Sequence, residues 1–120
     1  MAQTTKTNPN LVGLIDQLRL VARTNDAPVW RTVADRLSGP GRHWAELNLH
    51  HLDRHAPDGA TVVVPGKVLA TGALTKKLTV GAYAYSGKAK ERIEKAGGKA
   101  LTLAQLSADH PKGSKLLLLG

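Results

Sequence analysis

The sequence has no cysteine and no phenylalanine, and aromatic residues make up only 3% of its 120 residues. Without cysteine, the chain cannot form disulfides, use a thiolate in catalysis or hold zinc through cysteine ligands. Without phenylalanine, the core must be built mainly from aliphatic side chains. So few rings also argue against a protein that binds single-stranded nucleic acid by stacking bases on aromatic side chains.

Long apolar runs are missing as well. No stretch approaches the ~20 apolar residues that a membrane-spanning helix needs. The N-terminal stretch 1–6 is not followed by the apolar core of a signal peptide. We therefore expect a cytoplasmic protein with no membrane partner.

Catalytic patterns are equally scarce. The serines lack a nucleophile-elbow motif, and the nine acidic residues form no paired motif. Gly66, Gly72 and Gly81 do not have the spacing of phosphate-binding or dinucleotide-binding loops. We expect no enzymatic activity, no cofactor and no small-molecule substrate.

Positive charge is abundant and unevenly distributed. The formal net charge is +8, and residues 61–120 hold ten Lys and Arg against three Asp and Glu. Residues 1–60 hold seven Lys and Arg against six Asp and Glu. A small domain that is this basic typically binds a polyanion such as nucleic acid. The second half of the chain is where we expect most of that binding.

The first part of the chain has the pattern of helices. Residues 1–7 are polar and are expected to form a flexible basic arm, and residues 8–55 a helical part. Asn8 and Pro9 suit the N-cap and first position of a helix. A second amphipathic pattern follows Pro28 and ends at Ser38–Gly41, where glycine would take a left-handed conformation. Residues 42–55 are expected to form a third helix.

Residues 61–120 are expected to form an α/β core, organised around the stretch Thr61–Leu69. Its valines predict a buried strand, and Pro65–Gly66 predicts a type II turn that presents Lys67. A lysine beside closely approaching backbone suits a phosphate partner. We thus predict a single α/β domain, with N-terminal helices packed on an irregular β-β-α core that contains a small sheet.

The later elements follow from local signals. Residues 78–85 alternate as a strand does, with Tyr83 and Tyr85 on the same face, and Ser86 is expected to cap a helix that continues to about Ala96. Thr102 and Gln105 form a capping box before a short last helix. A short strand is expected at 100–101 and a final buried strand at 116–119.

Two other functions are compatible with parts of the pattern. His51 and His55 lie four residues apart and, with Asp53 or His50, could contribute to the metal site of a small metal-dependent enzyme. The two N-terminal helices could form a helix-turn-helix that binds DNA, as in a nucleic-acid-binding regulator. The second helix, however, has no row of side chains suited to reading base edges.

Several stretches together resemble one known family. They are Thr7–Pro9, Val29–Trp30 with Val33, Ala34 and Leu37, Ala45–Leu49, Val62–Leu69, Val80–Ser86, Ile93 with Ala96–Lys99, and Pro111–Gly113. In this order and at these separations they resemble ribosomal protein eighteen-e of the archaeal and eukaryotic large subunit, which is similar in turn to bacterial large-subunit ribosomal protein fifteen. The most specific part is the segment that contains Val-Pro-Gly-Lys-Val.

The resemblance implies a structural constituent of the large ribosomal subunit, in a compact archaeal form, that is located in the ribosome. Its implied partners are large-subunit ribosomal RNA and neighbouring large-subunit ribosomal proteins. Phosphate contacts by Lys and Arg provide affinity for such RNA without base-edge readout. The expected RNA-binding residues lie on the arm, in glycine-flanked loops and on the basic second half: Lys6, Asn8, Arg42, His43, Gly66, Lys67, Lys76, Lys77, Lys88, Arg92 and Lys99.

Overall fold

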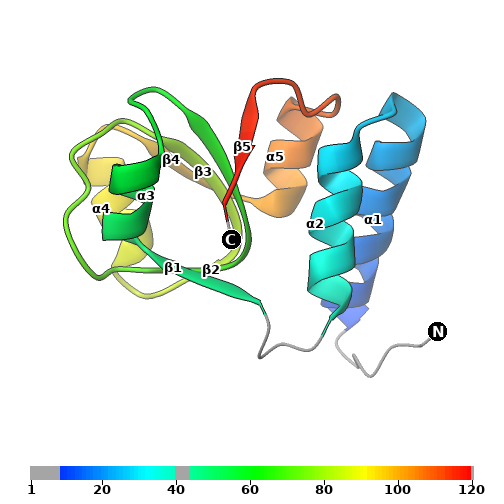
Figure 1. Cartoon of the computed structure of the whole chain (residues 1–120). Coiled ribbons are helices and arrows are strands. Elements are labelled where there is room, and N and C mark those ends of the chain that lie inside the picture. The colour runs from blue at the N-terminus through cyan, green and yellow to red at the C-terminus, as the bar shows by residue number, and fades with distance from the viewer. Residues whose placement is uncertain (1–8, 40–43, 120) are drawn as a thin grey trace.

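A five-stranded parallel sheet is the centre of the computed structural model, which describes residues 9–39 and 44–119 (Figure 1). The elements in chain order are α1 (Pro9–Asn25), α2 (Pro28–Ser38), β1 (Ala45–Asn48), α3 (Leu49–His55), β2 (Thr61–Leu69), β3 (Thr79–Tyr85), α4 (Ala89–Lys95), β4 (Lys99–Thr102), α5 (Leu103–Asp109) and β5 (Leu116–Leu118). The prediction of a single α/β domain with a small sheet is confirmed.

The long strand β2 organises the sheet. One of its edges pairs with β3, which in turn pairs with β4. The other edge is shared by two short strands, because β5 pairs with residues 61–63 and β1 with residues 66–69. All these pairs are parallel, so each connection must return the chain to the opposite end of the sheet. Helices α3, α4 and α5 make three of these returns, and loop 70–78 makes the fourth.

Strand β2 runs straight through the segment expected to turn. Its valines alternate between the two faces of the sheet, as the pleat requires. The register with β3 shifts between Val64 and Lys67, which is a bulge rather than a type II turn. Pro65 cannot donate a ladder hydrogen bond, and bulges are where sheets tolerate proline. The predicted turn is therefore wrong, although the predicted strand is confirmed.

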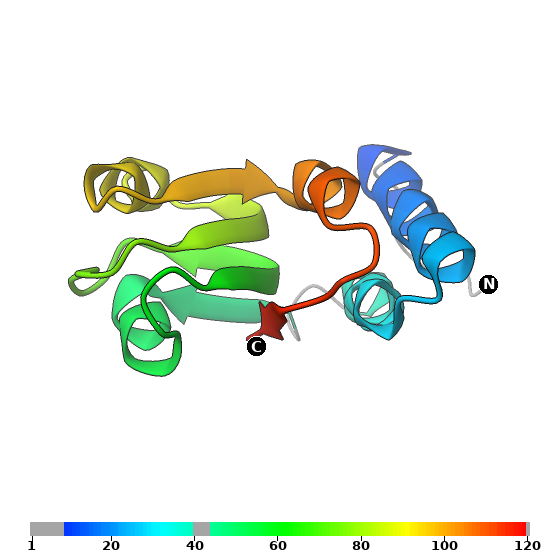
Figure 2. The same cartoon turned by 90° about the horizontal axis from the view of Figure 1, so that it is seen from above.

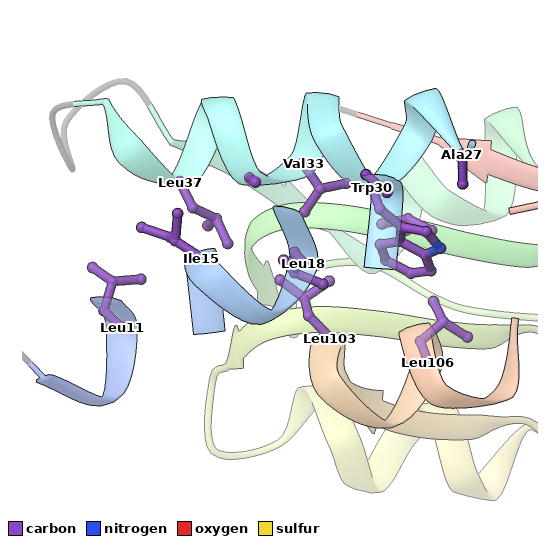
Figure 3. Packing of buried hydrophobic residues seen from close by; sticks show 12 residues of the cluster. Leu11, Ile15, Leu18, Ala27, Trp30, Val33, Leu37, Leu103 and Leu106 are labelled. Atoms are coloured by element: carbon purple, nitrogen blue, oxygen red, sulfur yellow. The ribbon is translucent and has the colours of Figure 1, made fainter. Parts of the chain in front are cut away.

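Helices cover both faces of the sheet, and the sheet separates two apolar cores (Figures 1 and 2). On one face, α3 and α4 pack on Val62, Val64 and Val68. On the other face, α1, α2 and α5 surround Trp30, as Figure 3 shows. The molecule therefore has a helical hairpin at one end and the α3–α4 pair at the other. We call the latter, together with loop 70–78, the α3–α4 end.

Local signals located most helix boundaries correctly. Pro9 and Pro28 begin α1 and α2, and Thr102 and Gln105 make the expected reciprocal capping bonds. Gly39 ends α2 with φ −75°, so the expected left-handed conformation is wrong for this glycine, and Gly41 lies outside the described residues.

Four other predictions of secondary structure and packing need correction. Residues 45–48 form strand β1 instead of the first part of a third helix, because they pair with β2. Ser86 does not cap α4, which begins at Ala89 after Lys88. Tyr83 packs in the core under α1 and α2, whereas Tyr85 packs in the α3–α4 core, so the two tyrosines do not share a face. Residues 116–118 of the last strand are only partly buried.

Candidate nucleic-acid interface

Lys67 is an exposed residue on the second half of β2, directly after the bulge. Its register partners are Glu46 on β1 and Ala84 on β3. Neighbours in register point to the same side of a sheet, so Lys67 has one acidic neighbour. The lysine is thus held by a strand near the carboxyl end of the sheet, rather than by a mobile turn.

Gly66 is buried, and its role is to let β1 approach β2. A Cβ at this position would lie 2.0 Å from the carbonyl oxygen of Ala45. Only glycine leaves room for this approach, which brings the partner Glu46 beside Lys67. The expected RNA contact through Gly66 is therefore not supported by its burial, whereas its neighbour Lys67 remains exposed.

Helix α4 carries a line of cations across the α3–α4 end. Lys88 precedes its first residue, Arg92 lies one turn later, and Lys99 follows at the start of β4; all three are exposed. Because α4 connects two parallel strands, the line runs from the carboxyl edge of the sheet to its amino edge. Lys95, which is not among the expected RNA-binding residues, lies one turn from Arg92 on the same exposed side of α4.

A shallow hollow of about 430 Å³ lies between α4 and loop 70–78. It is lined by Gly72, Ala73, Leu74, Arg92, Lys95 and Ala96. Arg92 donates to the carbonyl oxygen of Ala70, which leaves other guanidinium donors facing outward. Lys95 forms an ion pair of 3.2 Å with Glu91. The hollow is therefore lined by two cations, each with one bond inside the protein, and by small residues and Leu74.

Lys76 is engaged within the protein. Its Nζ donates to the backbone carbonyl oxygens of Asp53 and Ala56, at the C-terminal end of α3. A cation there satisfies carbonyls that have no partner in the helix and interacts favourably with the helix dipole. Its neighbour Lys77 is exposed and covers Gly97. The two adjacent lysines, which the sequence nominates equally for RNA binding, thus have different surroundings.

Replacing Lys76 with methionine is expected to lower the free energy of unfolding by about 1–2 kcal/mol, because two helix-end carbonyls lose a charged donor. Urea unfolding followed by circular dichroism measures this change. Lys77→Met is the matched control and should change stability by less than about 0.5 kcal/mol. Equal losses in the two variants would contradict the capping role of Lys76.

Asp53 fastens loop 70–78 to α3. Its Oδ1 accepts from the backbone N–H of Thr75 at 2.8 Å and from the Thr75 hydroxyl at 2.9 Å. These bonds, with a smaller contribution from the charge of Lys76, hold the pKa of Asp53 below its ordinary value. At the other end of the loop, the carbonyl of Thr71 accepts from His50 N–H, and Gly72 (φ +89°) packs on the His50 side chain.

Asp53→Asn is expected to lower the melting temperature at pH 7. Because the folded-state pKa is depressed, the carboxylate's contribution is full above its ordinary pKa of about 3.9 and is lost as the pH falls through the folded value. The difference between wild type and variant should therefore shrink as the pH is lowered from about 5 to about 3. Asp16→Asn, on the exposed side of α1, is the control. A difference that stays constant with pH would contradict the assignment.

The histidines of α3 do not form a metal site with their neighbours. The rings of His51 and His55 contact each other with centroids 4.3 Å apart and planes tilted by 41°. Burial, followed by the charges of His55, His50 and Arg54, lowers the pKa of His51. Within residues 9–39 and 44–119, no three His, Cys, Asp or Glu side chains converge as a metal site requires. The metal-enzyme hypothesis thus has no ligand set in this part of the chain.

The few aromatic residues are used in packing. The rings of Trp44 and Tyr83 meet edge to face, with centroids 4.9 Å apart. The Tyr85 hydroxyl lies 2.6 Å from the Leu101 carbonyl oxygen, and burial raises the pKa of this phenol well above its ordinary value. None of these three rings is a free platform on which a base could stack.

Four of the nominated residues, Lys6, Asn8, Arg42 and His43, lie outside the residues that the structure describes. Of the others, Lys67, Lys77, Lys88, Arg92 and Lys99 are exposed, Lys76 is engaged and Gly66 is buried. None of the described helices combines the length and the apolar character that a membrane span requires.

The family model and the individual relatives that match this chain agree with one another. The family model described as "Ribosomal protein 60S L18 and 50S L18e" matches residues 1–120. The chain is 45% identical over 114 residues to "Large ribosomal subunit protein eL18" of Archaeoglobus fulgidus, covering 95% of this chain and 97% of the relative. Proteins of the same name from Methanoregula boonei and Haloarcula marismortui are 43% and 44% identical over 114 residues; these matches cover 95% of this chain and 94% and 97% of the relatives.

Proposed function

Since the chain belongs to the family of ribosomal protein 60S L18 and 50S L18e, we propose that it is a structural constituent of the large ribosomal subunit that binds folded ribosomal RNA through its α3–α4 end. The binding residues in this proposal are Lys77, Lys88, Arg92, Lys95 and Lys99 at the α3–α4 end, together with Lys67. Lys67 points to the other face of the sheet, because its neighbour Val68 packs in the α3–α4 core. Its partners would be large-subunit RNA and neighbouring large-subunit proteins, and it would have no catalytic role. The relatives' names favour this function over a regulator or an enzyme.

The observation that carries this proposal is the line of exposed cations along α4 and the adjoining strand ends. Within the described residues, the side chains of Lys67, Lys77, Lys88 and Lys99 have no ion pair, so their charges are available to an external polyanion. Each phosphate that a cation neutralises releases condensed counterions, which drives binding without base-specific contacts. The fold also holds Lys88 directly before α4 and Lys67 and Lys99 on strands, which lowers the entropic cost of aligning these cations.

The test is a binding measurement with the full chain and deproteinised large-subunit RNA. The triple variant Lys67→Gln, Lys88→Gln, Lys99→Gln should bind more weakly, and its salt slope, log Kd against log salt concentration, should fall by about 2–3. Glutamine is chosen because glutamate at position 67 would face its register partner Glu46.

The control is Gln17→Glu on the exposed side of α1, which changes net charge by one unit away from the α3–α4 end. It is compared with each single lysine replacement and should leave the salt slope unchanged. Wild-type protein that fails to bind this RNA would overturn the proposed function. Wild-type affinity in the triple variant would overturn the proposed binding residues.

A further inference from the structure

A second group of cations surrounds a cleft at the opposite end of the molecule, where α1 meets α2. The cleft has a volume of about 590 Å³, and Arg19, Arg23 and Arg31 line it with Asp26 and Asp35. Figures 1 and 2 show the α1–α2 hairpin separated from α3 and α4 by the sheet. The longest dimension of the molecule is 41 Å. The α3–α4 end and this cleft therefore cannot both face the same short stretch of a ligand.

The arginines of the cleft differ in how they are used. Arg19 Nη2 lies 3.7 Å from Asp35 and donates to the Ser38 hydroxyl at 2.9 Å, so it joins the two helices. Arg23 and Arg31 are exposed, and within the described residues neither forms an ion pair. The pairing of Asp35 with Arg19 leaves Asp26 as the remaining acid on the lining.

The loop between α5 and β5 adds positive charge beside the cleft. The Trp30 indole N–H donates to the His110 carbonyl at 2.9 Å, and Gly113 packs on Val29 in the first turn of α2. These contacts fix residues 110–113 against the helix that carries Arg31. Lys112 is exposed on this loop, with Asp109 as the nearby acid in sequence.

We propose that the α1–α2 cleft binds a second RNA backbone segment, so that the protein joins two parts of the large-subunit RNA. This inference rests on the proposed function, because the RNA that occupies the α3–α4 end supplies the second segment. Arginine favours this partner, since its planar fork matches phosphate oxygens bidentately. The lining residues Arg19, Arg23, Asp26, Pro28, Arg31 and Asp35 include no large apolar side chain that would anchor a protein partner.

Directed hydroxyl-radical probing can test this arrangement, because the chain has no cysteine and a single introduced cysteine would carry the iron reagent alone. Pro28→Cys places the reagent on the cleft, and Gly87→Cys places it beside Lys88 at the α3–α4 end. In the complex with deproteinised large-subunit RNA, both positions should cleave RNA, at two different segments.

A salt titration of the same complex provides the second measurement. Arg23→Gln with Arg31→Gln should weaken RNA binding on the order of tenfold and lower the salt slope by about 2. Arg23→Lys with Arg31→Lys keeps both charges and should keep the slope. Gln17→Glu, which lies roughly 200° around α1 from Arg19, changes charge without entering the cleft.

The outcomes separate the two proposals. If the wild-type protein does not bind the RNA, the proposed function itself is overturned. A second outcome would overturn only the second RNA contact. In it, the wild type binds RNA, the reagent at position 87 cleaves RNA while the reagent at position 28 does not, and the Arg-to-Gln variant keeps the wild-type salt slope. If that variant binds RNA normally but dissociates from intact large subunits in salt, the cleft contacts a protein neighbour, and the RNA proposal is wrong.

Discussion

Replacing Gly66 with alanine is expected to lower the free energy of unfolding by about 3 kcal/mol, at the upper end of the usual cost of overpacking. The added Cβ would lie 2.0 Å from the Ala45 carbonyl oxygen and 2.8 Å from the Ala45 nitrogen and carbonyl carbon. All three are backbone atoms of β1, and no side-chain rotation can relieve the contact. The strand must move away from β2, which costs ladder hydrogen bonds.

The matched control is Gly87→Ala, since a Cβ there would meet no atom within 4 Å. This variant should differ from wild type by about 0.5 kcal/mol or less. Urea unfolding monitored by circular dichroism gives both values. A Gly66→Ala protein as stable as the control would show that β1 does not lie against Gly66 as described.

Trp30→Ala is expected to cost about 3–5 kcal/mol, the range found for removal of large buried aromatic side chains. Trp30 is fully buried among α1, α2 and α5 (Figure 3), and it is the largest of the fully buried side chains. Its indole also holds the loop after α5, through the bond to His110. The substitution therefore removes core volume and loosens the 110–115 loop together.

Trp30→Phe separates these two contributions. Phenylalanine fills much of the volume but cannot donate to the His110 carbonyl, so the loss should be about 1–3 kcal/mol. Unfolding in urea, followed at a far-ultraviolet wavelength because Trp44 also fluoresces, measures both variants. If Trp30→Ala loses less stability than Trp30→Phe, the described packing of this core is wrong.

The sequence predicted well what short-range chemistry determines. Pro28 fixes the start of α2, and the reciprocal bonds of Thr102 and Gln105 fix the start of α5, because each signal involves residues within one turn. The valines of β2 predicted a buried strand because β-branched residues fit a packed sheet on either face.

What the sequence did not predict depends on contacts between distant segments. Pro65–Gly66 has the composition of a turn, and only pairing with β1 and β3 keeps it in a bulged strand. Residues 45–48 look helical in isolation. They form a strand because they pair with the second half of β2, about twenty residues later in the chain. Lys76 and Lys77 are adjacent and identical in type, yet only the fold places one under the C-terminal end of α3.

The most direct test of the account is lysine reactivity toward an acylating reagent, measured by mass spectrometry in the free protein and in its complex with deproteinised large-subunit RNA. We expect Lys67, Lys88 and Lys99 to react in the free protein and to be protected in the complex. Lys76 should react slowly in both states, because its amine is already bonded to the carbonyls at the end of α3. Unchanged reactivity of Lys88 and Lys99 on RNA binding would contradict the assignment of the α3–α4 end as the RNA-binding surface, and unchanged reactivity of Lys67 would remove that residue from the proposed binding residues.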